Sequence, residues 1–569
     1  MIDERRQTAI LARTFFSRMF ESDLMPPGMP QVQIIVSVFA FLAAPSLILP
    51  LYLMKKYVWP LPEDVLRASL AADRTMAMLL TMTATAFITL AVWENIFPDR
   101  RDSRTLGVLP LRTRSFVLAR LYAIVVLFAI LFLGTTAISS FGFGIIASLA
   151  RLPEGMCSVL ISHFLAVAGG EAFVFFGIVA IQCALLNVTG PSTAHRVAVV
   201  LQVLLIVAIL QMPLVLPATP NFALDVDGTP KWAGMISASL LPPLWFLSLY
   251  QALIGQAYAG ADHLVRVAAV LGGLMPLVAL ALYAGSYRRL TRLAIEGQPV
   301  PTEQRAPLAS RIVGAAARAF TSVPSAAGVC AFTIRTLVRS RQHRMLIAVW
   351  IGVALALTIS AALPMIVRFG VVVFDRPRSA LLAGPLIFAA LIQTGMRSLF
   401  AIPVEIKANW TFRLREPLQL APALSGAAAA LILCGVIPPA LLAFVTGAAL
   451  WGAGLGVKHA IFCGVLATGF SQFLMRGVDR VPFTCTYTPG TAHIGKLWPL
   501  YLTMFSVATY GMARLEEEVL GTSQAFLVTV SIFAGITAAL WWFRAQEARQ
   551  LINLRFEEEP GGGLTLVHF

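Results

Sequence analysis

The sequence comprises 569 residues, of which 58% are hydrophobic and only 12% carry a charged side chain. Soluble domains carry roughly 25% charged residues, so this composition excludes a soluble globular protein and indicates a polytopic membrane protein. The net charge of +15 does not point to nucleic acid, because the basic residues stand between apolar stretches. Membrane lipids with anionic headgroups and an acidic partner surface are the expected counter-charges.

The chain begins with an amphipathic stretch, residues 8–22. Its apolar residues recur every four positions in two adjacent rows, and Arg13 and Arg18 lie opposite them. The stretch is too short and too charged to span a bilayer, so we expect an interfacial helix in the headgroup plane. The proline-rich residues 25–30 end it, and no cleavable signal peptide is expected. The two rows are Leu11, Phe15, Met19 and Ala12, Phe16, Phe20.

Apolar runs long enough to cross roughly 30 Å of hydrocarbon follow in two sets of six. The first set is predicted near 32–54, 75–93, 117–139, 159–185, 197–216 and 266–286. The second set is predicted near 345–367, 380–402, 422–444, 459–475, 498–514 and 522–543. The stretches 140–188 and 420–476 each allow a broken helix instead of continuous spans.

These runs predict five segments along the chain. They are an N-terminal interfacial helix (1–30), a first six-helix half (31–287), a polar Arg-rich cytoplasmic linker (288–325), a second interfacial helix with six spans (326–544) and a cytoplasmic tail (545–569). With twelve spans and both termini inside, most of the 43 Lys and Arg residues fall on the inner side, as the positive-inside rule requires. Lys55 and Lys56 are the clearest misfits, and we expect them to reach an outer interface.

A charged stretch from Trp93 to Arg120 separates the second and third predicted spans. Its many charges would each cost roughly 2.5–3.5 kcal/mol in hydrocarbon, so we expect a water-facing hairpin, broken by Pro98 and Pro110. The hairpin either receives force from a soluble partner or only sets orientation as a positive-inside loop. Its charged residues include Glu94, Asp99, Arg100, Arg101, Asp102, Arg104, Arg112 and Arg114.

The second set of spans repeats this order. Residues 329–341 form another amphipathic stretch, and residues 400–417 follow two spans later with alternating charged and aromatic residues between Pro403 and Pro417. Each half is therefore predicted to consist of an interfacial helix, two spans, a charged hairpin and four further spans.

This order resembles the membrane-spanning subunits of ATP-binding-cassette exporters of the ABC-2 type. The strings PDRRDSRTLGVLPLRTRSFVLAR, RSLFAIPVEIKANWTFR and VPFTCTYTPG are similar to those of bacterial members. Residues 9–20 resemble the elbow helix and residues 94–114 the coupling segment, with second copies at 329–341 and 404–417. The usual subunit has one six-span half and dimerises, whereas this chain carries two halves in tandem, so homo-dimerisation is not required.

The resemblance implies a permease of the bacterial inner membrane with two separate ATPase subunits on the cytoplasmic side. Those partners would bind ATP and Mg²⁺, and this chain would be neither an enzyme nor a holder of cofactor or metal. The implied ATPase-coupling residues are Glu94, Pro98, Asp99, Arg100, Arg101, Asp102, Glu405, Lys407, Asn409, Trp410 and Arg413.

Two motifs in the chain suggest other functions. Residues 490–497 fall one position short of a P-loop, because Leu497 stands where Ser or Thr must hold magnesium. Residues 99–101 faintly resemble a loop of major-facilitator transporters, but the flanking glycines of that loop are missing here. A 12-helix, ion-coupled transporter of that kind remains the alternative function. A membrane-embedded transferase is disfavoured, because no catalytic constellation emerges and the six cysteines are scattered.

Glu171 is the clearest carboxylate within a predicted span. Such a residue usually faces the bundle interior and marks a functional site. It is the candidate for the translocation path, as a proton carrier or substrate contact, and a purely structural acid paired across helices is the alternative. Gly169 and Gly170 would let a neighbouring helix approach closely. In the outer segments, residues 241–260 are expected to form an interfacial helix, with a cap over the pathway exit as the alternative. Glu516–Glu518 are expected to form a solvated acidic loop, with a bound cation as the alternative.

Overall fold

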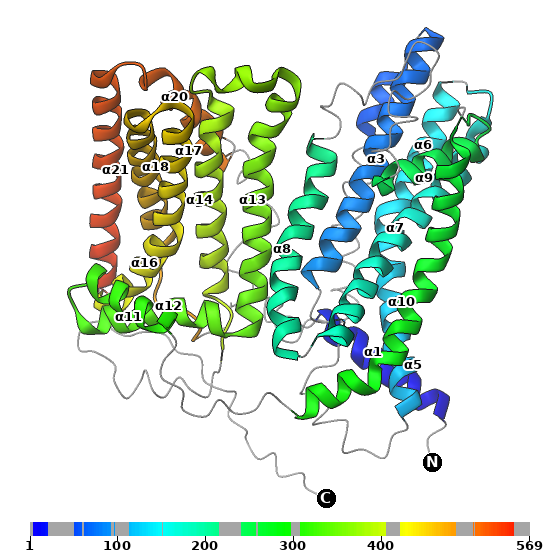
Figure 1. Cartoon of the computed structure of the whole chain (residues 1–569), viewed down its shortest axis with the longest axis horizontal. Helices are drawn as coiled ribbons and strands as arrows, with labels where there is room; N and C mark the ends of the chain where they lie inside the picture. The colour runs from blue at the N-terminus through cyan, green and yellow to red at the C-terminus, as the bar shows by residue number, and fades with distance from the viewer. Residues whose placement is uncertain are drawn as a thin grey trace, which may run out of the picture. The chain divides into compact units, whose positions relative to one another are not determined.

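The computed structural model shows a chain that is helical, without strands, over the residues it describes (Figure 1). Those residues are 4–20, 51–59, 62–92, 96, 113–150, 152–189, 191–215, 240–257, 260–296, 308–404, 421–484, 504–505 and 507–550. They belong to two compact units. Unit 1 is the described part up to residue 296, and unit 2 is the described part from residue 308.

Each unit is a bundle of long apolar helices with shorter helices packed against it (Figure 1). Unit 1 contains α1 (Glu4–Phe20), α3 (Glu63–Ala91), α5 (Thr113–Phe132), the π-helical turn η1 (Leu133–Ala137), α6 (Ile138–Leu149), α7 (Gly155–Val188), α8 (Pro191–Val215), α9 (Pro242–Leu253) and α10 (Asp262–Glu296). Unit 2 contains α11 (Leu308–Phe320), α12 (Pro324–Arg339), α13 (Arg341–Phe369), η5 (Gly370–Asp375), α14 (Ser379–Leu399), α16 (Ala421–Gly435), α17 (Ile437–Trp451), α18 (Ala453–Leu474), η7 (Val507–Gly511), α20 (Met512–Val519) and α21 (Ser523–Gln550).

Ten helices of the described part are long and apolar enough to cross a membrane. They are Ser69–Ala91, Arg114–Leu149, Gly155–Val188, Val197–Leu214, Asp262–Ser286, Gln342–Val367, Ser379–Leu399, Ala421–Trp451, Ala453–Leu474 and Ser523–Gln550. Each coincides with one predicted span, which confirms a polytopic all-helical membrane protein. Of the two other predicted spans, 32–54 lies largely outside the described residues. The described part of 498–514 forms η7 and the start of α20, and it is not among these ten helices.

The two stretches for which a broken helix was an open alternative, 140–188 and 420–476, both contain a break. The third predicted span of unit 1 continues to Leu149 through η1, and a turn then leads into α7 at Gly155. In unit 2, Val436 interrupts the helix between α16 and α17, just before two prolines that leave backbone carbonyls without helical partners. Gly452, at φ +93°, then reverses the chain into α18.

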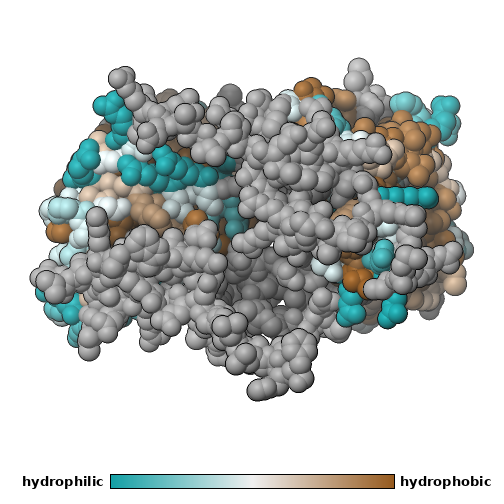
Figure 2. Space-filling model, turned by 90° about the horizontal axis from the view of Figure 1, so that it is seen from below, coloured by the Kyte–Doolittle hydropathy of each residue, from teal (hydrophilic) through white to brown (hydrophobic). Residues whose placement is uncertain are grey.

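The amphipathic stretch at the N-terminus folds as α1 and packs its apolar row onto the start of α5. Leu11 and Phe15 are buried, whereas Arg13 is exposed. The Phe15 ring lies 6.1 Å from that of Phe116, and the Arg120 guanidinium stands 4.7 Å above it. The second amphipathic stretch folds as α12 and buries Val329 and Leu337 in unit 2. Figure 2 shows the molecule from below, from the end at which α11 and α12 lie in Figure 1. The coloured part of this surface carries hydrophilic residues next to hydrophobic ones.

The predicted polar linker, 288–325, contains helical stretches in its described part. The helix α10 continues to Glu296, and α11 occupies Leu308–Phe320. The α11 helix buries Ala317 against Cys330 and Ala331 of α12, and Arg335 donates from its guanidinium to the Ser310 carbonyl at 3.0 Å. The predicted linker is therefore divided: its beginning belongs to α10 of unit 1, and α11 belongs to unit 2.

The aromatic segment 241–260, expected to form an interfacial helix, packs inside unit 1 rather than on its surface. It forms α9, and its Phe246 and Tyr250 are fully buried. They pack with Met82 of α3, Val167 of α7 and Ala268 of α10 in one cluster. Gly169 and Gly170 make room for this helix, as predicted, because a Cβ at Gly170 would lie 3.3 Å from the Phe246 ring.

Candidate functional site

The predicted ATPase-coupling residues lie outside the described part of the chain. This holds for the first group, from Glu94 to Asp102, and for the second group, from Glu405 to Arg413. The structure does describe residues at the beginning of each predicted hairpin, and these show how the hairpins are attached.

In unit 1 the attachment point is Ile96, which is fully buried. Its carbonyl accepts a hydrogen bond of 3.1 Å from the hydroxyl of Tyr283 on α10. Ile96 belongs to the same apolar cluster as Leu11 and Phe15 of α1 and Ala119 of α5. The predicted elbow, the hairpin and the third span therefore share one contact region.

In unit 2 residues 400–404 are attached at Phe483, within the segment VPFTCTYTPG. The Phe483 amide donates to the Phe400 carbonyl at 2.9 Å, and the Val404 amide donates to the Phe483 carbonyl at 3.2 Å. Phe483 has a left-handed backbone, φ 66°, and its buried ring lies 4.7 Å from that of His343. We call the pairing of residues 400–404 with Phe483 the clasp.

Glu171 lies at the centre of unit 1 and is fully buried. Its Oε1 accepts hydrogen bonds from Thr135 at 2.7 Å and Thr136 at 2.8 Å, both in η1. Its Oε2 is also buried and has no hydrogen-bond partner among the described residues. Oε1 of Glu171 thus links α7 to the π-helical turn, and Oε2 can accept a further hydrogen bond.

The π-helical turn explains why two neighbouring threonines reach the same carboxylate oxygen. The extra residue in a π-helical turn displaces the local backbone and leaves carbonyls short of their helical partners, and such turns are frequent at functional sites. The Ser139 hydroxyl donates to the Thr135 carbonyl at 3.1 Å, which supplies one of the missing donors. The hydroxyls of Thr85 on α3 and Ser140 on α6 are buried without a partner among the described residues.

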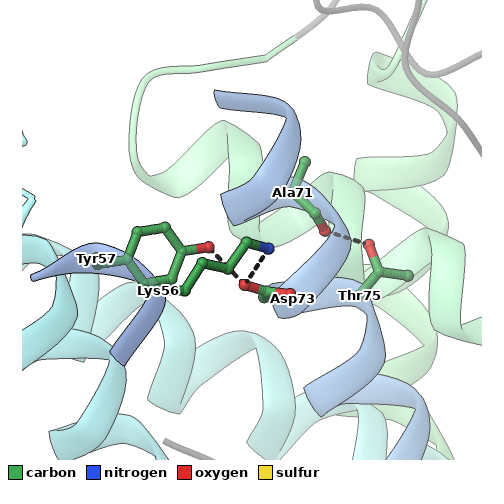
Figure 3. A network of polar contacts seen from close by, with 5 residues as sticks. All are labelled: Lys56, Tyr57, Ala71, Asp73 and Thr75. Carbon is green, nitrogen blue, oxygen red and sulfur yellow. Dashed lines mark hydrogen bonds and ion pairs between the residues drawn. The ribbon is translucent and has the colours of Figure 1, made fainter. Parts of the chain in front are cut away.

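A second polar network lies near the beginning of α3 (Figure 3). Asp73 accepts from Lys56 Nζ at 3.1 Å and from the Tyr57 hydroxyl, and Thr75 donates to the Ala71 carbonyl at 2.6 Å. Burial and the bond to Asp73 raise the pKa of Tyr57. Lys56, which did not fit the positive-inside rule, therefore forms an ion pair with Asp73 of α3.

Beside this network, three buried groups of unit 1 lack ordinary partners. Both ring nitrogens of His163, the hydroxyl of Tyr250 and Nε of Arg74 make no hydrogen bond among the described residues. The Arg74 guanidinium stands 4.8 Å above the Tyr250 ring, and that ring lies 5.8 Å from His163. Burial raises the pKa of Tyr250 to about 12. The cluster joins α3, α7 and α9 through aromatic and cation–π contacts.

The acidic run Glu516–Glu518 is not a solvated loop, contrary to expectation. It belongs to α20, and Glu516 is fully buried, with its Oε1 2.7 Å from Nδ1 of His459 on α18. Glu517 accepts from the amide of Ser379 at 2.8 Å, so it covers the beginning of α14. Burial raises the pKa of Glu516, and the hydrogen bond and charge of His459 partly offset that rise.

Glu516 should make stability depend on pH. Because its folded-state pKa is raised, the folded chain keeps a proton that the unfolded chain has already released. The stability contribution is therefore complete below the ordinary pKa of 4.5 and declines as pH rises through the raised value. In thermal unfolding of the purified chain, E516Q is expected to remove this decline, and the exposed E518Q should retain it. An identical pH dependence in E516Q and the parent chain would contradict the assignment.

Among the described residues, no group of three or more His, Cys, Asp or Glu side chains could hold a metal ion. The P-loop-like residues 490–497 lie outside the described part. Of the contacts above, the sequence indicated only Glu171. The pairs His459–Glu516 and Asp73–Lys56 were missed because their partners are far apart in the chain.

No family model matches this sequence, and neither the curated proteins nor the solved structures give a match.

Proposed function

We propose that this chain is the permease of an ABC-2-type exporter in the bacterial inner membrane, with both termini in the cytoplasm. Two separate ATPase subunits would supply the energy from ATP and Mg²⁺. Its two halves would form the translocation unit without a second copy. The substrate is unidentified, and the apolar spans favour a lipid-like or amphipathic cargo.

The observation that carries this proposal is the shared contact region at the start of each charged hairpin. In unit 1 one apolar cluster contains Phe15 of α1 and Ile96 of the first hairpin. In unit 2 one cluster contains Leu337 of α12 and Ile402 before the second hairpin. A load applied to either hairpin would therefore reach the amphipathic helix and the neighbouring spans together, as a coupling segment requires.

A second parallel between the units supports two related halves. The third span of unit 1 passes through the π-helical turn η1, whose Thr135 and Thr136 donate hydrogen bonds to Glu171 of α7. The corresponding helix of unit 2 is interrupted at Val436, where Gln393 of α14 donates to the carbonyls of Gly435 at 2.9 Å and Ala467 of α18 at 3.0 Å. In both units a buried polar side chain of another span bonds to an irregular turn in the third span, from the fourth span in unit 1 and from the second span in unit 2.

Charge reversal in the first hairpin tests the proposal. The double variant R100E/R101E replaces two cationic contacts with repulsive ones, so we expect ATPase association to fall more than about tenfold, which corresponds to roughly 1.4 kcal/mol. The measurement is co-elution of a co-expressed ATPase subunit, together with transport. Membrane insertion should be unchanged.

The matched control is R549E, an exposed arginine in the last turn of α21, which should leave association intact. Full ATPase association in R100E/R101E would overturn the assignment of the hairpin. Transport that continues in cells lacking the ATPase would overturn the proposed function itself.

An ion-coupled secondary transporter is the second candidate, and one observation favours it. Glu171 is a fully buried carboxylate with one oxygen that has no partner among the described residues, which is the arrangement expected of a proton-coupling group. That transporter would need no ATPase, and the behaviour of E171Q separates the two candidates.

A further inference from the structure

A small cavity lies in unit 2 between the beginning of α16, the turn after α18 and the end of α21. Its volume is about 110 Å³, and its walls include Leu424, Asp479, Arg544 and Glu547. Water occupies roughly 30 Å³ per molecule, so the cavity has room for a group of a few heavy atoms. It borders the apolar cluster that contains Leu424, Ala548 and the α12 residue Leu337.

Arg544 is the basic group of this cavity. Its residue surface is 8% exposed, and Nε donates to the buried Gln472 Oε1 at 2.8 Å. That bond fixes the plane of the guanidinium. The two terminal nitrogens make no further hydrogen bond among the described residues, and their fork geometry matches a phosphate.

The same cavity carries carboxylates. Glu547 Oε1 pairs with Arg476 at 2.7 Å, and its Oε2 accepts from the Gly477 amide at 3.1 Å. Asp479 pairs with Arg480 at 3.0 Å. Each carboxylate oxygen can accept more than one hydrogen bond, so these walls can also receive an ammonium group. The cavity thus offers charge of both signs, which an anion alone would not need.

Two neighbouring features place the cavity at the level of lipid headgroups. Trp541 and Trp542 stand three and two positions before Arg544 and are 53% and 52% exposed, as in the aromatic belt at a membrane interface. The amphipathic helix α12 packs against α16 at the same end of the bundle (Figure 1). Basic pockets between membrane helices on the cytoplasmic side are known to bind the phosphate-bearing headgroups of cardiolipin and phosphoinositides.

We propose that this cavity binds the headgroup of a phospholipid that carries both a phosphate and a primary ammonium, such as phosphatidylethanolamine. Arg544 holds the phosphate, and Asp479 and Glu547 receive the ammonium hydrogens. The bound lipid bridges α16, α18 and α21 beside α12. This proposal is independent of the energy source for transport.

Lipid titration of the full-length chain in a neutral detergent, followed by native mass spectrometry, tests the proposal. Phosphatidylethanolamine should bind about tenfold more tightly than phosphatidylcholine or phosphatidylglycerol, as one or two charge-assisted hydrogen bonds provide. R544Q should weaken all three lipids, whereas D479N should remove only the preference for phosphatidylethanolamine. R549Q, on the exposed side of α21, should change nothing.

Three results would overturn the proposal. The first is equal binding of the three lipids by the parent chain, and the second is an unchanged preference in D479N together with unchanged affinity in R544Q or R544K. Water-soluble phosphoethanolamine serves as the final arm. If it binds as tightly as the lipid, the site takes a free phosphoamine and the assignment to a membrane lipid is wrong.

Discussion

E171A is expected to destabilise the folded chain by about 2–4 kcal/mol and to abolish transport. The substitution opens a void at a fully buried position, and it removes the carboxylate oxygen that accepts from Thr135 and Thr136. The threonine hydroxyls can turn back to the backbone, since Thr135 also lies 2.8 Å from the Leu131 carbonyl, which keeps the loss within this range. The measurement is thermal unfolding in detergent.

E171Q separates the two candidate functions. Glutamine keeps the size and the acceptor oxygen of Glu171, so stability should fall by less than about 1 kcal/mol. An ATP-driven permease should then transport at a rate close to that of the parent chain. Loss of transport by a stably folded E171Q would instead identify a coupling carboxylate. The control is L165A on the same helix, at a residue that is 50% exposed, which should change neither property.

G426L is expected to have the largest effect on unit 2, because it separates α12 from α16. A Cβ at Gly426 would lie 2.2 Å from the carbonyl oxygen of Ala326 and 3.0 Å from its Cα. The clash is with the backbone, so no side-chain rotation relieves it. Overpacking in a well-packed core costs roughly 1–3 kcal/mol and occasionally more, and we expect at least about 3 kcal/mol here.

Thermal unfolding and the protease sensitivity of α12 measure this effect. G426A should already lower stability, since the clash begins at Cβ. The control is G535A on α21, where an added Cβ meets no atom within 4 Å and where alanine favours the helix. Equal unfolding temperatures for G426L and G535A would show that α12 does not depend on this contact.

The long helices were predictable because hydrocarbon thickness dictates a minimum apolar length, and each of the ten spanning helices stands out in hydropathy alone. Burial inside the bundle was not predictable in this way. Residues 242–253 looked interfacial because they combine aromatic side chains with prolines, yet α9 is buried by α3, α7 and α10. Composition cannot distinguish a side chain that faces lipid from one that faces another helix.

Glu171 was recognisable as a candidate site because a carboxylate within an apolar span is rare and usually faces the interior of the helix bundle. Its partners were not, since nothing in the residues LGTTA requires a π-helical turn. Glu516 was misread for a related reason. Three consecutive acids favour a solvated surface, and only the fold brings His459 within 2.7 Å of the first of them.

The left-handed backbone at Phe483 has a mechanical consequence. A non-glycine residue in this conformation stores roughly 1–2 kcal/mol, and here the two backbone bonds to Phe400 and Val404 hold it in place. A pull strong enough to break one bond also releases the stored energy, which makes the second bond easier to break. The clasp is therefore rigid under a small pulling force and opens abruptly once one of its two hydrogen bonds breaks.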